Sequence, residues 1–233
     1  DIYPVLFYEK MTQRGLCVSG QKVLDVGTGT GVLPRNMYHY GAQWTGTDIS
    51  SEQIEQARSL AIDANMSIAF EVMPTEKINF APGTFDVITA CQCFWYFDHD
   101  RVFPSLFDLL KDGGKLVILS MAWLPFEDDI ARASEELVLK YSPQWTGAHA
   151  TRNGITLPEV AYKYFDKDDD EDFDLQVPFT RDSWHGRMKA CRGVGASLSG
   201  EALEKWEKEH WALISATTPE TFYVLHFASL VVL

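Results

Sequence analysis

The stretch from Val23 to Leu33, VLDVGTGTGVL, constrains the fold more than any other part of the chain. Apolar residues, a carboxylate and three glycines at alternate positions are typical of a buried strand that ends in a tight turn before a helix. Pro34 fits this prediction, because a proline in the first turn of a helix loses no hydrogen bond. Such a turn lets the backbone approach a ligand closely, since glycine has no side chain.

Apolar patterns beyond this turn alternate between strand and helix as far as Tyr141. Short apolar runs predict strands at residues 22–26, 43–48, 68–72, 85–91 and 115–122. Apolar stripes predict helices that begin near residues 32 and 50, a helix over 101–111 that stops at Asp112-Gly113-Gly114, and a helix over 127–141. This alternation predicts an α/β fold with an open, mostly parallel sheet.

The last third of the chain is less regular. Thr156 and Glu159 predict a capped helix over 156–165, and the seven acids of residues 166–174 predict a solvated loop. Residues 221–233 are apolar on both alternating faces, which predicts a central strand. The remaining elements expected here are a strand at 173–179, helices at 181–192 and 201–215, and a hinge at 193–200.

Composition narrows the class of protein. The chain has 233 residues, 46% of them hydrophobic and 23% charged, which suits a soluble globular domain with no membrane span. A net charge of −13 repels phosphate backbones, so we expect no nucleic-acid partner. Four cysteines in a chain of this length favour a reduced, cytoplasmic protein, and Cys91-x-Cys93 has no second ligand pair for a metal. The chain begins with Asp1, so we expect some N-terminal sequence to be missing.

The spacing of the glycines separates two kinds of nucleoside site. A dinucleotide fingerprint is G-x-G-x-x-G, whereas Gly27, Gly29 and Gly31 form a G-x-G-x-G pattern. S-adenosylmethionine (SAM) carries an ammonium, a carboxylate and a sulfonium, and Asp25 suits its cationic groups. Asp48, at the end of the second strand, can accept both ribose hydroxyls of either ligand, or it can cap the helix that begins near Ser50.

Four stretches of the sequence together resemble the class I SAM-dependent methyltransferases. The stretches VLDVGTGTG, WTGTDIS, MPTEKINFAPGTFDVITACQCFWYFD and LLKDGGKLVILS, within residues 20–123, carry the resemblance. They are most similar to the small-molecule type 11 group, with its ubiquinone-biosynthesis and trans-aconitate methyltransferase relatives. The resemblance implies a Rossmann-like seven-stranded sheet whose last strand is antiparallel. We expect one domain over residues 1–233, with residues 20–123 as the SAM-binding core and a helical lid at 180–220.

The resemblance also implies which residues hold the cofactor. The glycines would line the methionine tail, Asp48 would hold the ribose and Ile49 would pack on the adenine. Pro74 stands where many relatives carry an aspartate, so backbone amides would replace a carboxylate at the adenine edge. The full expected set is Asp25, Gly27, Thr28, Gly29, Gly31, Asp48, Ile49, Gln53, Thr75, Glu76, Cys91 and Gln92.

The acceptor should meet the cofactor beyond the carboxyl ends of the strands, where the aromatic run of residues 94–97 begins. Trp95 and Tyr96 are candidate acceptor contacts, while Phe94 and Phe97 suit the core. His99 is a candidate general base or a residue at a helix start. Further candidate acceptor contacts are His185 and Arg187 in the lid and Tyr8 near the N-terminus.

These features predict an enzyme that moves a methyl group from SAM to a small molecule by in-line displacement. Positioning alone can lower the barrier of such a reaction, so no catalytic residue is obligatory. A SAM-binding protein without turnover is the second hypothesis, and an NAD-dependent oxidoreductase is the third. The sequence identifies neither the acceptor nor the oligomeric state.

Overall fold

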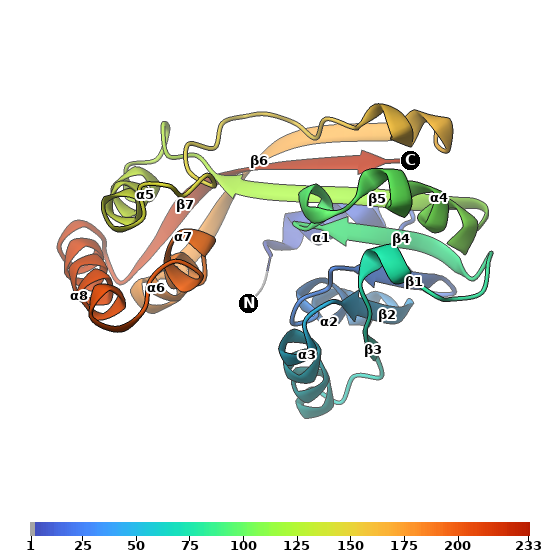
Figure 1. The fold of residues 1–233 in the computed structure, drawn as a ribbon, viewed down its shortest axis with the longest axis horizontal. Coiled ribbons are helices and arrows are strands. Elements are labelled where there is room, and N and C mark those ends of the chain that lie inside the picture. The colour runs from blue at the N-terminus through green and yellow to red at the C-terminus, as the bar shows by residue number, and fades with distance from the viewer. Residues whose placement is uncertain (1–2) are drawn as a thin grey trace. The chain divides into compact units, whose positions relative to one another are not determined.

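The computed structural model describes residues 3–233, which form a seven-stranded sheet in the order β3-β2-β1-β4-β5-β7-β6 (Figure 1). Strands β1 to β5 pair in parallel, with Leu24 of β1 in register with Thr45 of β2 and Ile88 of β4. The Rossmann-like fold class predicted from the sequence is confirmed. The strands are β1 (Lys22–Val26), β2 (Gln43–Asp48), β3 (Ala69–Val72), β4 (Phe85–Cys91), β5 (Leu110–Trp123), β6 (Asp169–Thr180) and β7 (Thr221–Val232).

Strand β7 lies between β5 and β6, as the doubly apolar pattern of residues 221–233 predicts for a central strand, and it is antiparallel, as the resemblance implies. Leu116 and Leu233 exchange backbone hydrogen bonds of 3.0 and 2.9 Å, the reciprocal pairing of an antiparallel ladder. Leu124 also donates its amide hydrogen to the carbonyl of Leu225. From the first contact to the second, the residue number rises by eight on the β5 side and falls by eight on the β7 side. Both contacts therefore belong to a single antiparallel register.

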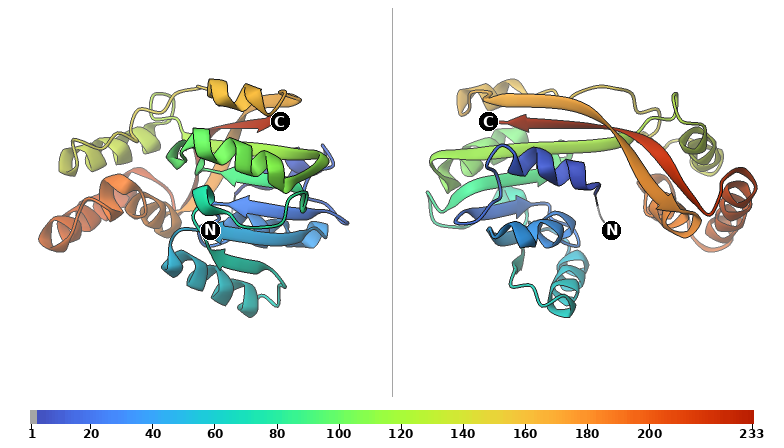
Figure 2. Two further views of the ribbon diagram at one scale, coloured as in Figure 1. Left: turned by 45° about the vertical axis from the view of Figure 1, so that its right-hand side comes forward. Right: turned by 180° about the vertical axis from the view of Figure 1, so that it is seen from behind.

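Helices and short helical turns join the strands. They are α1 (Val5–Thr12), α2 (Val32–Met37), η1 (Tyr38–Tyr40), α3 (Ser51–Asp63), η2 (Thr75–Lys77), η3 (Phe94–Tyr96), α4 (His99–Leu109), α5 (Asp129–Tyr141), η4 (Glu159–Lys163), α6 (Arg181–Lys189), α7 (Arg192–Gly195) and α8 (Gly200–Thr217). Ser50 caps α3, because its hydroxyl accepts the amide hydrogen of Gln53 at 3.2 Å. Helices α4 and α1 cover opposite faces of the sheet, as the front and rear views show (Figure 2).

The chain forms two compact units. Unit 1 comprises residues 1–120, 154–172 and 229–233, and unit 2 comprises residues 121–153 and 173–228. One core cluster of unit 1 joins Phe103 and Leu106 of α4 with Leu24 of β1 and Ile88 of β4. The core of unit 2 gathers around Trp184 and Trp206. The lid role of residues 180–220 and the single-domain organisation stay predictions.

The expected stop after the fourth helix is wrong. Helix α4 ends at Leu109, and Asp112-Gly113-Gly114 lies inside β5 rather than between a helix and a strand. The register of β4 against β5 jumps here, since Phe85 pairs with Leu110 but Val87 pairs with Lys115. The glycines therefore form a bulge in a strand, which the same residues can do as readily as a turn.

The acidic run of residues 166–174 is not a loop, because β6 begins at Asp169. Its carboxylates bind α1 and the residues after it: Asp169 accepts from Arg14 Nε at 2.6 Å, and Glu171 accepts from Arg14 Nη2 at 2.9 Å. Lys10 also pairs with Glu171. Strand β6 is an edge strand of the sheet, and charged side chains on an edge strand discourage pairing with another chain. The like charges that predicted a loop are offset by cations distant in sequence.

A further expectation about the last third is wrong, and another stays a prediction. Thr156 does not cap a helix, because η4 begins at Glu159 and its N-cap residue is Pro158. No side chain caps η4, and proline holds the residue before it in extended backbone. The candidate hinge at residues 193–200 contains the end of α7. Gly193 and Val194 are buried at its start, where a Cβ on Gly193 would come within 2.6 Å of Val138 of α5, while residues 195–197 are exposed, so the hinge role stays a prediction.

Candidate functional site

The glycine turn leaves the end of β1 with three residues in left-handed backbone. Gly27, Gly29 and Gly31 have φ values of 64°, 56° and 72°, which side chains rarely adopt. A Cβ on Gly27 would lie 2.7 Å from Cys93, and one on Gly31 would lie 2.7 Å from Phe70. A Cβ on Gly29 would meet only Gln53 Oε1, at 3.8 Å. The outer two glycines thus allow close packing, and the middle one borders open space.

Asp48 ties the turn to the end of β2. Its Oδ2 accepts the amide hydrogen of Gly29 at 2.9 Å, and its Oδ1 accepts that of Ser50 at 2.9 Å. The carboxylate thus links the glycine turn to Ser50, the residue that caps α3, and its predicted contact with a ribose stays a prediction. A carboxylate oxygen has a second lone pair, so each one can still accept a hydroxyl hydrogen from a ligand.

Asp25 is buried and faces inward. Its side chain is 2% exposed, and its two oxygens accept from the hydroxyls of Thr28 and Thr89, each at 2.6 Å. Burial raises the pKa of this carboxyl to about 6, against the lowering effect of the two hydroxyls. In this structure Asp25 braces the turn against β4, and its predicted contact with a cationic ligand group stays a prediction.

Of the residues predicted to lie near the adenine, one is exposed, one is buried and one makes a hydrogen bond within the protein. Ile49 is 73% exposed at the end of β2, so its side chain is available for packing on a flat ligand. Thr75 is buried in η2. Glu76 accepts the amide hydrogen of Asp98 at 3.1 Å, a contact that links η2 to the start of α4. The link gives Glu76 a structural role that the sequence did not predict.

The end of β4 holds two thiols around a strained residue. Gln92 has a φ of 62°, rare for a residue with a side chain and frequent at functional sites. Burial raises the pKa of Cys91, and Cys93 donates to the carbonyl of Val26 at 3.0 Å. The hydroxyl of Tyr3 is hydrogen-bonded to Cys91, and Tyr8 Oη accepts the amide hydrogen of Tyr3 at 2.8 Å. The N-terminal segment thus reaches the end of β4, on the side that the sequence assigned to Tyr8.

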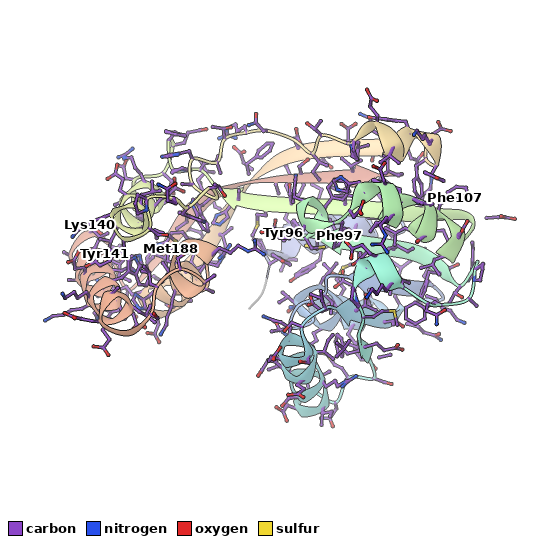
Figure 3. All side chains as sticks on the ribbon, viewed as in Figure 1. Tyr96, Phe97, Phe107, Lys140, Tyr141 and Met188 are labelled. Carbon is purple, nitrogen blue, oxygen red and sulfur yellow. The ribbon has the colours of Figure 1, made fainter. Side chains whose placement is uncertain are left out.

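The aromatic run after β4 splits as predicted between core and surface. Phe94 is 4% exposed and Phe97 packs against the same cluster, whereas Trp95 and Tyr96 are 52% and 61% exposed. Figure 3 shows Tyr96 and Phe97 beside each other at η3. His99 stacks on Phe94 and its Nε2 donates to the Phe94 carbonyl at 3.0 Å, which leaves only Nδ1 to accept a proton. Its role as a base stays a prediction.

Known proteins are similar in sequence to the part of the chain that builds this site. A family model described as a methyltransferase domain matches residues 23–114, which include the glycine turn, Asp48 and the end of β4. Residues 23–114 therefore match a methyltransferase domain, as the sequence motifs predict. Curated relatives of this methyltransferase domain include the ubiquinone biosynthesis O-methyltransferases of Xanthomonas euvesicatoria pv. vesicatoria, 29% identical over 62% of the chain, and of Bordetella bronchiseptica, 30% identical over 62%. The match spans about 60% of the length of each relative.

Solved structures share the fold of the methyltransferase domain and of the C-terminal part of the chain. A protein of Anaeromyxobacter dehalogenans described as a candidate type II methyltransferase has a TM-score of 0.64 at 17% identity, over 99% of this chain and 95% of its own. Phosphoethanolamine N-methyltransferase 2 of Haemonchus contortus, solved with phosphomonomethylethanolamine and S-adenosylhomocysteine, has a TM-score of 0.54 at 20% identity, over 96% of this chain and 51% of its own. At these identities the likeness shows the fold.

Outside the methyltransferase domain, the two lid residues predicted from the sequence lie in unit 2. His185 stacks on Trp206 and its Nδ1 lies 2.9 Å from His210 Nδ1. Arg187 lies over the ring of Trp123, 4.9 Å from its centroid. Both are held within unit 2 by aromatic contacts, so their contact with an acceptor stays a prediction.

His210 joins three helices of unit 2. It is fully buried on α8, and its Nε2 lies 3.1 Å from Ser134 Oγ on α5, which also accepts from Trp184 Nε1 on α6 at 2.9 Å. Burial lowers the pKa of His210 to about 3. The imidazole is therefore neutral at neutral pH and serves as a hydrogen-bonding link in the core.

This link predicts a loss of stability in acid. Because the pKa of His210 falls from 6.5 to about 3 on folding, the unfolded chain binds a proton first, and stability falls as pH drops from 6.5 towards 3. Urea unfolding should show a slope between pH 6 and 4 that is about 1.4 kcal/mol per pH unit smaller in His210→Asn than in the parent. His39→Asn, at an exposed position, is the control and should keep the parent slope. An identical slope in both variants would contradict the buried neutral state of His210.

Thr89 is a site residue that the sequence analysis missed. Thr89 is fully buried opposite Asp25 in the parallel register, and it is a lone hydroxyl within the apolar run of β4. That pattern, next to an aspartate strand, was the signal available.

The part of the chain that the structure describes shows neither a cluster of metal ligands nor a membrane-spanning helix. Residues 3–233 contain no group of three or more His, Cys, Asp or Glu side chains placed to hold a metal ion. The four cysteines are free and buried. None of the helices described is long and apolar enough to cross a membrane.

Proposed function

We propose that the chain transfers a methyl group from SAM to a small-molecule acceptor. One observation carries the proposal: Gly29 borders open space while its amide hydrogen is bound by the carboxylate of Asp48. This arrangement offers bare backbone and a hydroxyl acceptor side by side, which fits the tail and the ribose of SAM. The exposed side chain of Ile49 next to Asp48 supports an adenine on the same side.

The proposed cofactor, when bound, supplies a methyl group already activated by the positive charge on sulfur. The protein must then bind, orient and exclude water. Gly27, Gly29 and Gly31 allow the backbone to approach the tail, Asp48 orients the ribose, and Cys91 and Gln92 border the reacting end. Alignment of the acceptor with the sulfur can supply roughly 7–11 kcal/mol of the barrier reduction.

The acceptor side is aromatic rather than charged. Trp95 and Tyr96 expose their rings directly after β4, and flat faces of this kind suit an aromatic or apolar acceptor. The relatives named for ubiquinone biosynthesis O-methylation support a hydroxyl on a ring as the attacked group. The net charge of −13 argues against a nucleic-acid acceptor, and four free cysteines support a reducing, cytoplasmic location.

Labelled SAM tests this proposal. The purified chain is incubated with radiolabelled SAM and a metabolite extract, and label in a small organic product is the expected result. Tight binding of SAM without any labelled product would favour a binding protein that lacks turnover. Binding of NAD in place of SAM would favour the oxidoreductase hypothesis.

A further inference from the structure

Arg35 on α2 differs from the other partly buried arginines of the chain. Within residues 3–233 the partly buried arginines are Arg14, Arg35 and Arg181. Arg14 pairs with Asp169 and Glu171, and Arg181 pairs with Glu220. Arg35 pairs with no carboxylate of the described chain, although acids outnumber bases by 33 to 20. A partly desolvated guanidinium without a counter-ion is costly, and a site for an anion explains such a residue.

The side chain of Arg35 lies beside the glycine turn. Its Nε donates to the carbonyl of Thr30 at 3.1 Å, so the guanidinium folds back toward the turn. The buried hydroxyl of Tyr8 interacts electrostatically both with Arg35 and with Cys91 at the end of β4. Tyr8 is thus a common neighbour of Arg35 and of Cys91, the residue to which the sulfonium end of SAM is assigned.

We propose that Arg35 binds the carboxylate of the methionine tail of SAM. The inference rests on the proposed function. The cofactor has a single carboxylate, and a guanidinium offers two parallel donors that match its geometry. The contact with Thr30 uses Nε, so the two terminal nitrogens of Arg35 remain as donors for that carboxylate. Arg35 is a binding residue here, and none of the motifs that carry the resemblance includes it.

A pair of ligands isolates the carboxylate. Calorimetry measures the binding of SAM and of decarboxylated SAM, which retains the adenosyl group, the sulfonium and the ammonium. Arg35→Gln should weaken SAM binding by about ten- to a hundredfold, because hydrogen bonds to a charged group are lost. The same variant should bind decarboxylated SAM within about twofold of the parent. Arg35→Lys keeps the positive charge but lacks the two parallel donors of a guanidinium, so we expect an intermediate loss of affinity for SAM.

Matched controls separate the outcomes. Arg58→Gln, at an exposed arginine that donates to the Phe70 carbonyl, should leave both affinities unchanged. A loss in Arg35→Gln that is equal for both ligands would show a structural role and overturn the inference, as would no loss for either. If the parent binds decarboxylated SAM but Arg35→Gln keeps full SAM affinity, only the Arg35 assignment fails. If the parent binds neither ligand, the proposed function fails with it.

Discussion

Replacement of Asp48 by alanine should weaken the binding of SAM about a hundredfold. The carboxylate sits at the end of β2 with one oxygen on Gly29 and the other on Ser50, and each oxygen has a lone pair left for a ribose hydroxyl. Hydrogen bonds to a charged acceptor are worth about 1.5–3 kcal/mol each, so two of them account for a loss of this size. Calorimetric titration with S-adenosylhomocysteine measures it without turnover.

Two further variants show whether the loss is specific. Asp63→Ala removes an exposed aspartate at the end of α3 and should bind the ligand like the parent. Asp48→Asn keeps one acceptor oxygen and should lose less affinity than Asp48→Ala. An Asp48→Ala protein with parental affinity would remove the ribose role from this residue and leave it as the link between the turn and α3.

The glycines of the turn should separate binding from stability. Gly29→Ala places a methyl group in open space, so the fold loses only the roughly 1–2 kcal/mol of left-handed backbone, while that methyl group obstructs the ligand. Gly31→Ala adds an overlap with the buried ring of Phe70 at 2.7 Å, and overpacking adds about 1–3 kcal/mol of destabilisation. Gly29→Ala should therefore be the more stable variant and still lose SAM affinity by about tenfold or more.

Denaturant unfolding and ligand titration of the same two proteins give both numbers. Gly15→Ala, where the backbone is also left-handed and nothing lies within 4 Å of the added Cβ, is the control for backbone strain alone. It should lose about as much stability as Gly29→Ala and none of the affinity. Equal SAM affinity in Gly29→Ala and the parent would mean that no ligand passes over the middle glycine.

The parallel half of the fold could be predicted from sequence because its signals are local. The strands at residues 22–26 and 85–91 match their expected bounds, since apolar runs bounded by turn residues decide them without help from tertiary contacts. The inserted position of β7 came from the resemblance and from its doubly apolar pattern. Local patterns thus decided the elements that carry the cofactor site.

The features that escaped prediction depend on distant partners. The acidic run became strand β6 because Arg14 and Lys10, more than 150 residues earlier, neutralise it. Asp112-Gly113-Gly114 formed a bulge because β4 pairs on both sides of it. Arg35 looked like an ordinary helix residue, and only the lack of a paired acid at its place in the fold sets it apart. Charge pairing over long separations has no sequence period that could reveal it.

A crystal structure of the chain with S-adenosylhomocysteine tests the central claim most directly. We expect the methionine tail to lie along residues 27–31, with both ribose hydroxyls within hydrogen-bond distance of Asp48 and the carboxylate on Arg35. A nucleoside bound elsewhere, or a turn whose middle glycine is covered by protein side chains in the complex, would contradict it.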